Sequence, residues 1–246
     1  MNAWSREDII IAYALYCVTP LEKINTSNKV IQQVSEIIPH SVSSIVMRMR
    51  NFQHVDSKAS QGLKNVARAD RMIYEEFKHD FGALSLEAET LTGLAIFDSS
   101  PLQGAKPLSS LTNHGRVSRE RHFFKQAVLA AYDDRCFISG CTLPQMLVAS
   151  HIKPYSQCRS EADRVSPDNG ICLNVFYDKA FDRGLITIVP SMKIYVSPII
   201  LNDINDSFTA RWLASLDGMT LSQPTRFPPR KEFLEYHNTK IFRRVT

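Results

Sequence analysis

The stretch that decides the fold reads Val148-Ala149-Ser150-His151-Ile152-Lys153-Pro154, then Pro167-Asp168-Asn169-Gly170, then Asp178-Lys179-Ala180-Phe181-Asp182-Arg183-Gly184. This order predicts an apolar strand that ends at a histidine, a polar loop, a turn and a short helix. Asp178 and Asp182 are four residues apart, so they share one face of that helix. Two carboxylates at this spacing repel each other unless a cation lies between them, and hard ions such as Mg2+ take oxygen ligands. With His151 as a base for water, the stretch holds the groups needed to hydrolyse a phosphodiester.

The same residues resemble the HNH nucleases, whose site is a ββα-metal unit. His151 comes first, then Asn169, and the steps of nine residues to Asp178 and four more to Asp182 are those of colicin-type members. The strings Ser-His-Ile-Lys-Pro and Phe-Asp-Arg-Gly-Leu look like the restriction-type bacterial branch. The chain departs from the family name in having Asp178 for the last histidine, which a Mg2+ site tolerates. It also has Ser150 where many relatives place a metal ligand, which leaves more metal positions to water.

The resemblance implies a role for each of these residues. His151 would be the general base, and Asn169 would hold the loop and orient that base. Asp178 and Asp182 would bind one divalent ion, Mg2+ or Mn2+. The residues alone leave other interpretations open, namely a structural histidine, a plain Asp-Asn-Gly turn and a charged helix face without an ion. Candidate phosphate clamps in the same stretch are Lys153 and Arg183.

Composition sets the broad class of the protein. The chain has 246 residues, of which 44% are hydrophobic and 22% charged, so it is long enough for two modest globular domains. It has no apolar run long enough to cross a membrane, and Met1 to Glu7 does not read as a signal peptide, so we expect a cytoplasmic protein. The net charge of +4 permits nucleic-acid binding without requiring it. The five cysteines lack a Cys-x-x-Cys pair, which argues against a structural zinc site.

The first third of the chain is helical in pattern. Ser5 with Asp8 predicts a capping box at the start of the first helix. A helix over residues 27–38 and a third helix from Ser41 follow, and they resemble a helix-turn-helix DNA reader. The alternative is an ordinary helical bundle with a solvated polar face. The side chains expected to contact DNA are Arg48, Arg50 and Asn51.

The remaining pattern completes an α+β fold. Helices are predicted over 66–77, 85–94 and 118–132, strands over 147–149 and 171–173, a helix over 175–182, a hairpin within 185–196, and two tail helices. The first half of helix 118–132 carries cations that fit either a phosphate backbone or a solvated face: Arg116, Arg119, Arg121 and Lys125. We therefore predict a helical DNA-recognition domain at 1–96, a linker at 97–115, and an HNH ββα-metal nuclease domain with a helical C-terminal tail at 116–246.

The function expected from the sequence is a metal-dependent DNA endonuclease that restricts foreign DNA. One ββα site cuts one strand, so a double-strand cutter would be a homodimer acting on double-stranded DNA. A DNA-binding regulator with a vestigial HNH unit is the alternative, supported by Ser150. A third hypothesis is a nicking or RNA-directed nuclease.

Overall fold

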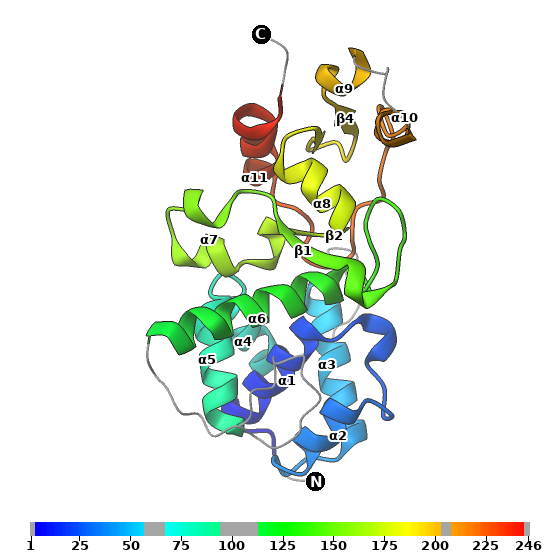
Figure 1. The fold of residues 1–246 in the computed structure, drawn as a ribbon. Coiled ribbons are helices and arrows are strands. Elements are labelled where there is room, and N and C mark those ends of the chain that lie inside the picture. Colours follow the sequence, from blue (N-terminus) through cyan, green and yellow to red (C-terminus); the bar gives the residue numbers. More distant parts are fainter. Residues whose placement is uncertain (1–2, 57–66, 94–112, 203–207, 244–246) are drawn as a thin grey trace.

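The computed structural model describes residues 3–56, 67–93, 113–202 and 208–243. One long helix, α6 (Asn113–Ala131), crosses the middle of the molecule, with helices α1 to α5 on one side of it and a small-sheet region on the other (Figure 1). None of the helices in the described ranges is long and apolar enough to cross a membrane.

The N-terminal helices are α1 (Arg6–Val18), α2 (Lys29–Ser35), α3 (Val42–Asp56), α4 (Arg68–Phe77) and α5 (Phe81–Thr92). The predicted capping box of α1 is confirmed, because the Ser5 hydroxyl accepts from the Asp8 amide while the Asp8 carboxylate accepts from the Ser5 amide. Helix α5 begins four residues before the predicted Ser85, because the side chain of Asp80 accepts from the Ala83 amide at 2.9 Å and caps it.

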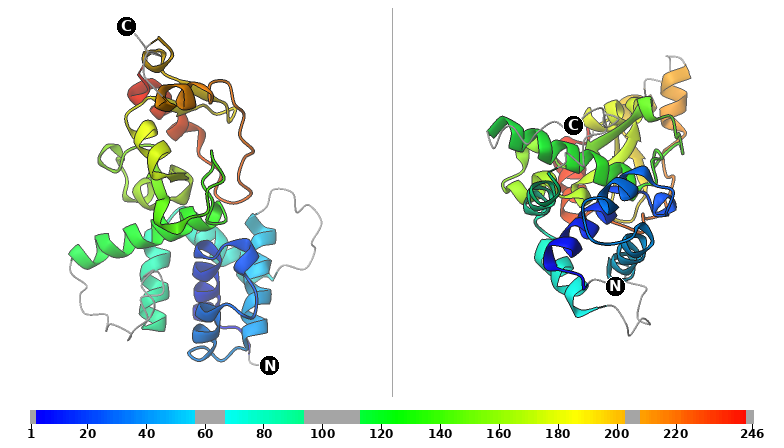
Figure 2. Two further views of the ribbon diagram at one scale, coloured as in Figure 1. Left: turned by 45° about the vertical axis from the view of Figure 1, so that its right-hand side comes forward. Right: turned by 90° about the horizontal axis from the view of Figure 1, so that it is seen from below.

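Helix α6 is shared between the two halves of the molecule. It packs against α1 and α5 on one side and against the first two strands on the other, and the left view of Figure 2 shows the same arrangement. Phe123, Ala127 and Val128 have no exposed surface, so the buried residues of α6 join the two halves into one hydrophobic cluster. The predicted linker at 97–115 lies mostly outside the described residues, and the domain boundaries stay a prediction.

The central unit is a hairpin followed by a helix. Strand β1 (Leu147–His151) pairs antiparallel with β2 (Gly170–Asn174), with His151 opposite Gly170. Helix α8 (Val175–Asp182) starts directly after β2, because Asn174 caps it by accepting from the amides of Phe176 and Tyr177. The elements between the strands are η3 (Tyr155–Gln157), α7 (Glu161–Val165) and η4 (Pro167–Asn169), and η2 (Pro144–Met146) leads into β1.

A second hairpin and short helices complete the chain. Strand β3 (Ile186–Ile188) pairs with β4 (Ile194–Val196), and the later elements are α9 (Pro198–Asn202), α10 (Phe208–Ala214), α11 (Lys231–Tyr236) and the π-helical turn η5 (His237–Ile241). Gly184 ends α8 at a φ of 67°, and a Cβ there would lie 2.1 Å from the carbonyl oxygen of Ile241. Only glycine fits this contact between α8 and the C-terminal segment.

A buried arginine ties the C-terminal segment to the first helix. Arg226 donates to the carbonyl oxygens of Tyr16 and Thr19 at the end of α1 and to that of Ala130 at the end of α6. Helix C-termini carry partial negative charge, so a guanidinium suits this position. The mixed helical and small-sheet fold expected from the sequence is thus confirmed, although its two halves share a core.

Candidate active site

His151 is the last residue of β1 and lies on the face of the hairpin that meets α6. Its ring stacks on Phe124 of α6, with centroids 4.0 Å apart and an interplanar angle of 13°. Its strand partner Gly170 faces the same way, since a Cβ there would lie 2.3 Å from a Val128 methyl group. The close approach of α6 therefore holds the imidazole in one orientation.

The hydrogen bond of His151 determines which ring nitrogen is free to accept a proton. Nε2 lies 3.0 Å from the carbonyl oxygen of Arg164, which can only accept, so the neutral ring carries its hydrogen on Nε2. Nδ1 then keeps its lone pair. Burial lowers the pKa of His151, the bond to Arg164 opposes that shift, and the nearby charge of Arg121 adds to it. The ring is therefore neutral near pH 7, as a general base must be.

Asn169 holds the loop that supplies this carbonyl group. It is completely buried; its side-chain oxygen accepts from the Lys153 amide at 2.9 Å, and its amide nitrogen donates to the carbonyl oxygen of Asp163 at 3.0 Å. Asp163 directly precedes Arg164, so Asn169 connects the end of β1 to the segment that orients His151. Its contacts go beyond those of a plain turn residue.

The two carboxylates lie on α8, which covers the other face of the hairpin. Asp178 is partly buried and Asp182 is exposed. Although much of the residue is exposed, partial desolvation of its carboxyl group raises the pKa of Asp182; the negative charge of Asp178 raises it further, and Lys179 and Arg183 act in the opposite direction. The two carboxylates are one helical turn apart on α8, as their spacing predicts.

The structure does not gather His151 with these carboxylates into one cluster. Side chains alternate along a strand, so Ser150 points away from the His151 face and toward α8. The hairpin lies between α6 and α8 in Figure 1. In the part of the chain that the structure describes, no group of three or more His, Cys, Asp and Glu side chains could hold a metal ion.

The two candidate phosphate clamps lie near the same loop and helix. Lys153 places its Nζ 4.9 Å from the centre of the Tyr236 ring, and its main chain is held by Asn169. Arg183 is exposed directly after Asp182 and is the C-cap of α8. Both side chains lie within the ββα unit, and their binding of phosphate stays a prediction.

The three side chains expected to read DNA have partners inside the N-terminal bundle. Arg48 forms an ion pair with the fully buried Asp70, and Asn51 donates to the same carboxylate at 3.1 Å. Arg50 donates to the carbonyl oxygen of Ile24 at 2.9 Å. These contacts favour a structural role for the three, and their role in reading DNA stays an untested prediction.

The cysteines take part in local hydrogen bonds. None of the five forms a disulfide. Cys136 Sγ accepts from the Asn174 amide at 3.2 Å at the start of α8, and Cys158 Sγ lies 3.4 Å from the amide nitrogen of Asn169. Their positions support the packing of the ββα unit and its loop.

A pocket beside His151 brings together residues that the sequence motifs did not predict to be neighbours. It has a volume of 470 Å³ and is lined by Arg121, Phe124, Lys125, Leu147, Val148, Ala149, His151 and Tyr155. The cation-rich first half of α6 was a visible signal for Arg121 and Lys125, whereas nothing in the sequence placed Tyr155 beside them.

One comparison with known proteins identifies the ββα region. Residues 136–189 match the family model described as HNH endonuclease, a segment that spans β1, β2, α8 and β3. No curated protein matches the chain.

Proposed function

Because residues 136–189 form an HNH endonuclease domain, we propose that the chain is a metal-dependent DNA endonuclease in which His151 is the general base. The domain itself indicates nuclease activity, with DNA as the substrate. The observation that carries the proposal is the bond from His151 Nε2 to the carbonyl oxygen of Arg164, which leaves Nδ1 free to take a proton from water.

Asp178 and Asp182 are the proposed metal ligands. HNH nucleases use a divalent metal, and two neighbouring carboxylates are the oxygen donors that Mg2+ and Mn2+ prefer. Ser150 adds a buried hydroxyl on the face of β1 toward α8, with no hydrogen-bond partner among the described residues, which fits a site made of oxygen atoms. When bound, the ion would supply positive charge to the phosphate and to the leaving oxygen.

The free edge of β1 is the proposed path of the DNA strand. Among the described residues β1 pairs only with β2, so its other edge is not covered by a strand. His151 lies on one face of the hairpin and the carboxylates lie on the helix over the other. A strand laid along this edge reaches both, with Lys153 and Arg183 as candidate contacts to its phosphates.

We further propose that the enzyme restricts foreign DNA as a homodimer, with helices α2 and α3 contributing to recognition. Support comes from the resemblance of the strings around His151 and Asp182 to restriction-type HNH proteins. A DNA-binding regulator with a vestigial site is the second candidate. It is favoured by the lack, among the described residues, of a third His, Cys, Asp or Glu beside the carboxylate pair.

A plasmid cleavage assay separates these candidates. Methylated and unmethylated plasmid would be incubated with the wild-type chain, with Mg2+ and Mn2+ in parallel, and with the His151→Ala and His79→Ala variants. His79 is exposed, so its variant controls for loss of a histidine. We expect His151→Ala to lose cleavage by about 10² to 10⁴-fold while DNA binding is retained, because a base acts on water rather than on the duplex. Full cleavage by His151→Ala would remove the residue from this role, and absence of cleavage by the wild type with either ion would favour the regulator.

A further inference from the structure

The pocket between α6 and β1 has an unusual charge composition for a hollow beside a histidine. Its lining contains Arg121 and Lys125 and no carboxylate. Within the described parts of the chain, neither cation forms an ion pair, and both side chains are exposed. Two cations at the rim of a pocket that no carboxylate lines create a local positive potential that attracts an anion.

Helix α6 places both cations at the rim of the same pocket. Arg121 and Lys125 are one helical turn apart, so they project from the same face. Phe124 lies between them in sequence, is 4% exposed, and stacks on His151. The buried residues of α6 thus fix the two cations at the rim of the pocket that holds the imidazole.

An aromatic ring closes the same pocket. The guanidinium carbon of Arg121 lies 5.4 Å from the centre of the Tyr155 ring, and the ring of His151 meets that ring edge-on at 6.0 Å. Stacking on an aromatic face orients a guanidinium while leaving its N–H groups available at the edge. Arg121 is therefore held close to the reactive side chain with donors still available.

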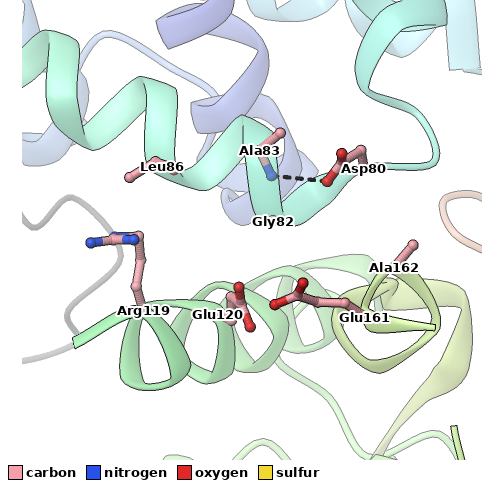
Figure 3. A pocket seen from close by; sticks show the side chains of 8 residues that line it. All are labelled: Asp80, Gly82, Ala83, Leu86, Arg119, Glu120, Glu161 and Ala162. Atoms are coloured by element: carbon pink, nitrogen blue, oxygen red, sulfur yellow. Dashed lines mark hydrogen bonds between the residues drawn. The ribbon is translucent and has the colours of Figure 1, made fainter. Parts of the chain in front are cut away.

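The pocket on the other flank of α6 shows the contrast. Asp80 of the α5 N-cap, Glu120 of α6 and Glu161 of α7 line it, and Figure 3 shows the carboxylates of Glu120 and Glu161 turned toward each other. Its one arginine, Arg119, is nearly buried and paired with Glu89 at 2.6 Å. Three carboxylates make this pocket a poor site for a phosphate. Among the α6 cations whose side chains the structure describes, Arg119 is therefore structural, whereas Arg121 and Lys125 lie at the His151 pocket.

We infer that Arg121 and Lys125 each bind a backbone phosphate of the DNA strand at the pocket beside His151. The inference rests on the proposed endonuclease function and adds a DNA-contacting element, helix α6, to the ββα unit. Contacts to phosphate position a duplex without reading its sequence. Because α6 also packs against α1 and α5, the helix that contacts the DNA is the same one that joins the two halves of the molecule.

The salt dependence of DNA binding tests this inference without requiring cleavage. A labelled duplex of mixed sequence would be titrated, in the presence of a metal chelator, with the full-length wild type, with Arg121→Gln, with Lys125→Gln and with the double variant. Each phosphate contact contributes a slope of about 0.9 to log K against log salt. We expect each single variant to reduce the slope by about one and the double variant by about two. The variants should therefore lose more DNA affinity, relative to the wild type, at low salt than at high salt.

Arg211→Gln is the matched control. Arg211 is exposed on α10, an element that does not line the pocket, and its loss removes the same charge. A double variant with the wild-type slope, or an equal loss of slope in Arg211→Gln, would overturn the inference. Thermal melting of each variant confirms that the fold is retained, which the exposed positions of Arg121 and Lys125 lead us to expect.

The result is separable from that of the cleavage assay. A pocket-dependent salt slope in a chain that cuts no DNA would support the phosphate site and contradict the endonuclease. Cleavage that depends on His151, with binding unaffected by the double variant, would do the reverse.

Discussion

At the residue scale, the orientation of His151 depends on Asn169, which acts through the loop that it holds. Asn169 holds Lys153 at the end of β1 and Asp163 in the loop, and the next carbonyl group along the chain, that of Arg164, orients His151. The arrangement places a neutral imidazole with one free lone pair at the mouth of a cationic pocket. These three hydrogen-bond partners are main-chain groups, so the orientation of the imidazole depends on how the loop folds as well as on its stacking against Phe124.

The carboxylate pair leads to a prediction about metal binding. Calorimetric titration with Mn2+ should show one modest-affinity site in the wild type and none in Asp182→Asn, because the amide cannot replace an ionised ligand. Binding should also be lost at low pH, where carboxylates are protonated. Without metal the variant should melt at the same or a higher temperature, since the raised pKa of Asp182 means that its charge is disfavoured in the folded state. Glu7→Gln, an exposed change in α1, is the control, and undiminished Mn2+ binding in Asp182→Asn would place the ion elsewhere.

At the scale of elements, the contact between α6 and the hairpin determines the shape of the site. A Cβ on Gly170 would lie 2.3 Å from Val128 and 3.0 Å from Phe124. The Phe124 ring also stacks on His151. The missing side chain at Gly170 is therefore what allows the helix to approach the strand that carries the base.

Gly170→Ala should destabilise the chain by about 1 to 3 kcal/mol, the usual cost of overpacking a core. Urea unfolding measures this change. Gly82→Ala is the matched control, because a Cβ there meets no atom closer than 3.5 Å and alanine favours the helix that Gly82 occupies. Pairing Gly170→Ala with Val128→Ala should recover part of the loss, and a neutral Gly170→Ala would show that α6 moves away at little cost.

At the scale of the whole molecule, two buried C-terminal side chains hold distant parts together. Arg226 is 2% exposed and donates to main-chain carbonyl groups of α1 and α6. His237 is 1% exposed, stacks on Phe181 of α8 at 3.6 Å, and bonds to Thr187 and to the carbonyl oxygen of Phe181. The tail is thus part of the fold that supports α8.

Arg226→Ala should lower the free energy of unfolding by about 3 kcal/mol or more, because three buried carbonyl groups lose their donors. The measurement is urea unfolding followed by far-ultraviolet circular dichroism. Arg211→Ala, an exposed change on α10, should alter stability by less than about 0.5 kcal/mol. A small effect of Arg226→Ala would mean that water replaces the guanidinium.

Stability should also depend on pH through His237, whose pKa burial lowers to about 4. As pH falls, the histidine of the unfolded chain, with a pKa near 6.5, binds a proton before that of the folded chain. The contribution of neutral His237 to the free energy of unfolding is therefore fully present above pH 6.5 and is lost toward pH 4. The loss is about 3 kcal/mol over this window. The difference between the melting temperatures at pH 7.5 and pH 5 should be smaller for His237→Gln than for the wild type or for His79→Ala. An unchanged pH dependence in His237→Gln would assign it to other groups.

The sequence by itself determined the local elements of this protein. The bounds of α8, the capping box of α1, the order of the two strands and the glycine after α8 follow from spacing and capping residues, which act within a few positions of each other. The HNH motif was equally local, and the match at residues 136–189 confirms it. The roles of His151, Asn169, Asp178 and Asp182 remain predictions for the experiments above.

Only the tertiary structure decided which surfaces meet. It put Arg48 and Asn51 on Asp70, placed Arg226 against the end of α1, and set His151 and the carboxylates of α8 on opposite faces of one hairpin. It also packed α6 against α1 and α5 on one side and against β1 and β2 on the other. Spacing fixes the face of a helix or strand on which a side chain lies, but the partner of that face is chosen by burial and shape complementarity between segments far apart in the chain.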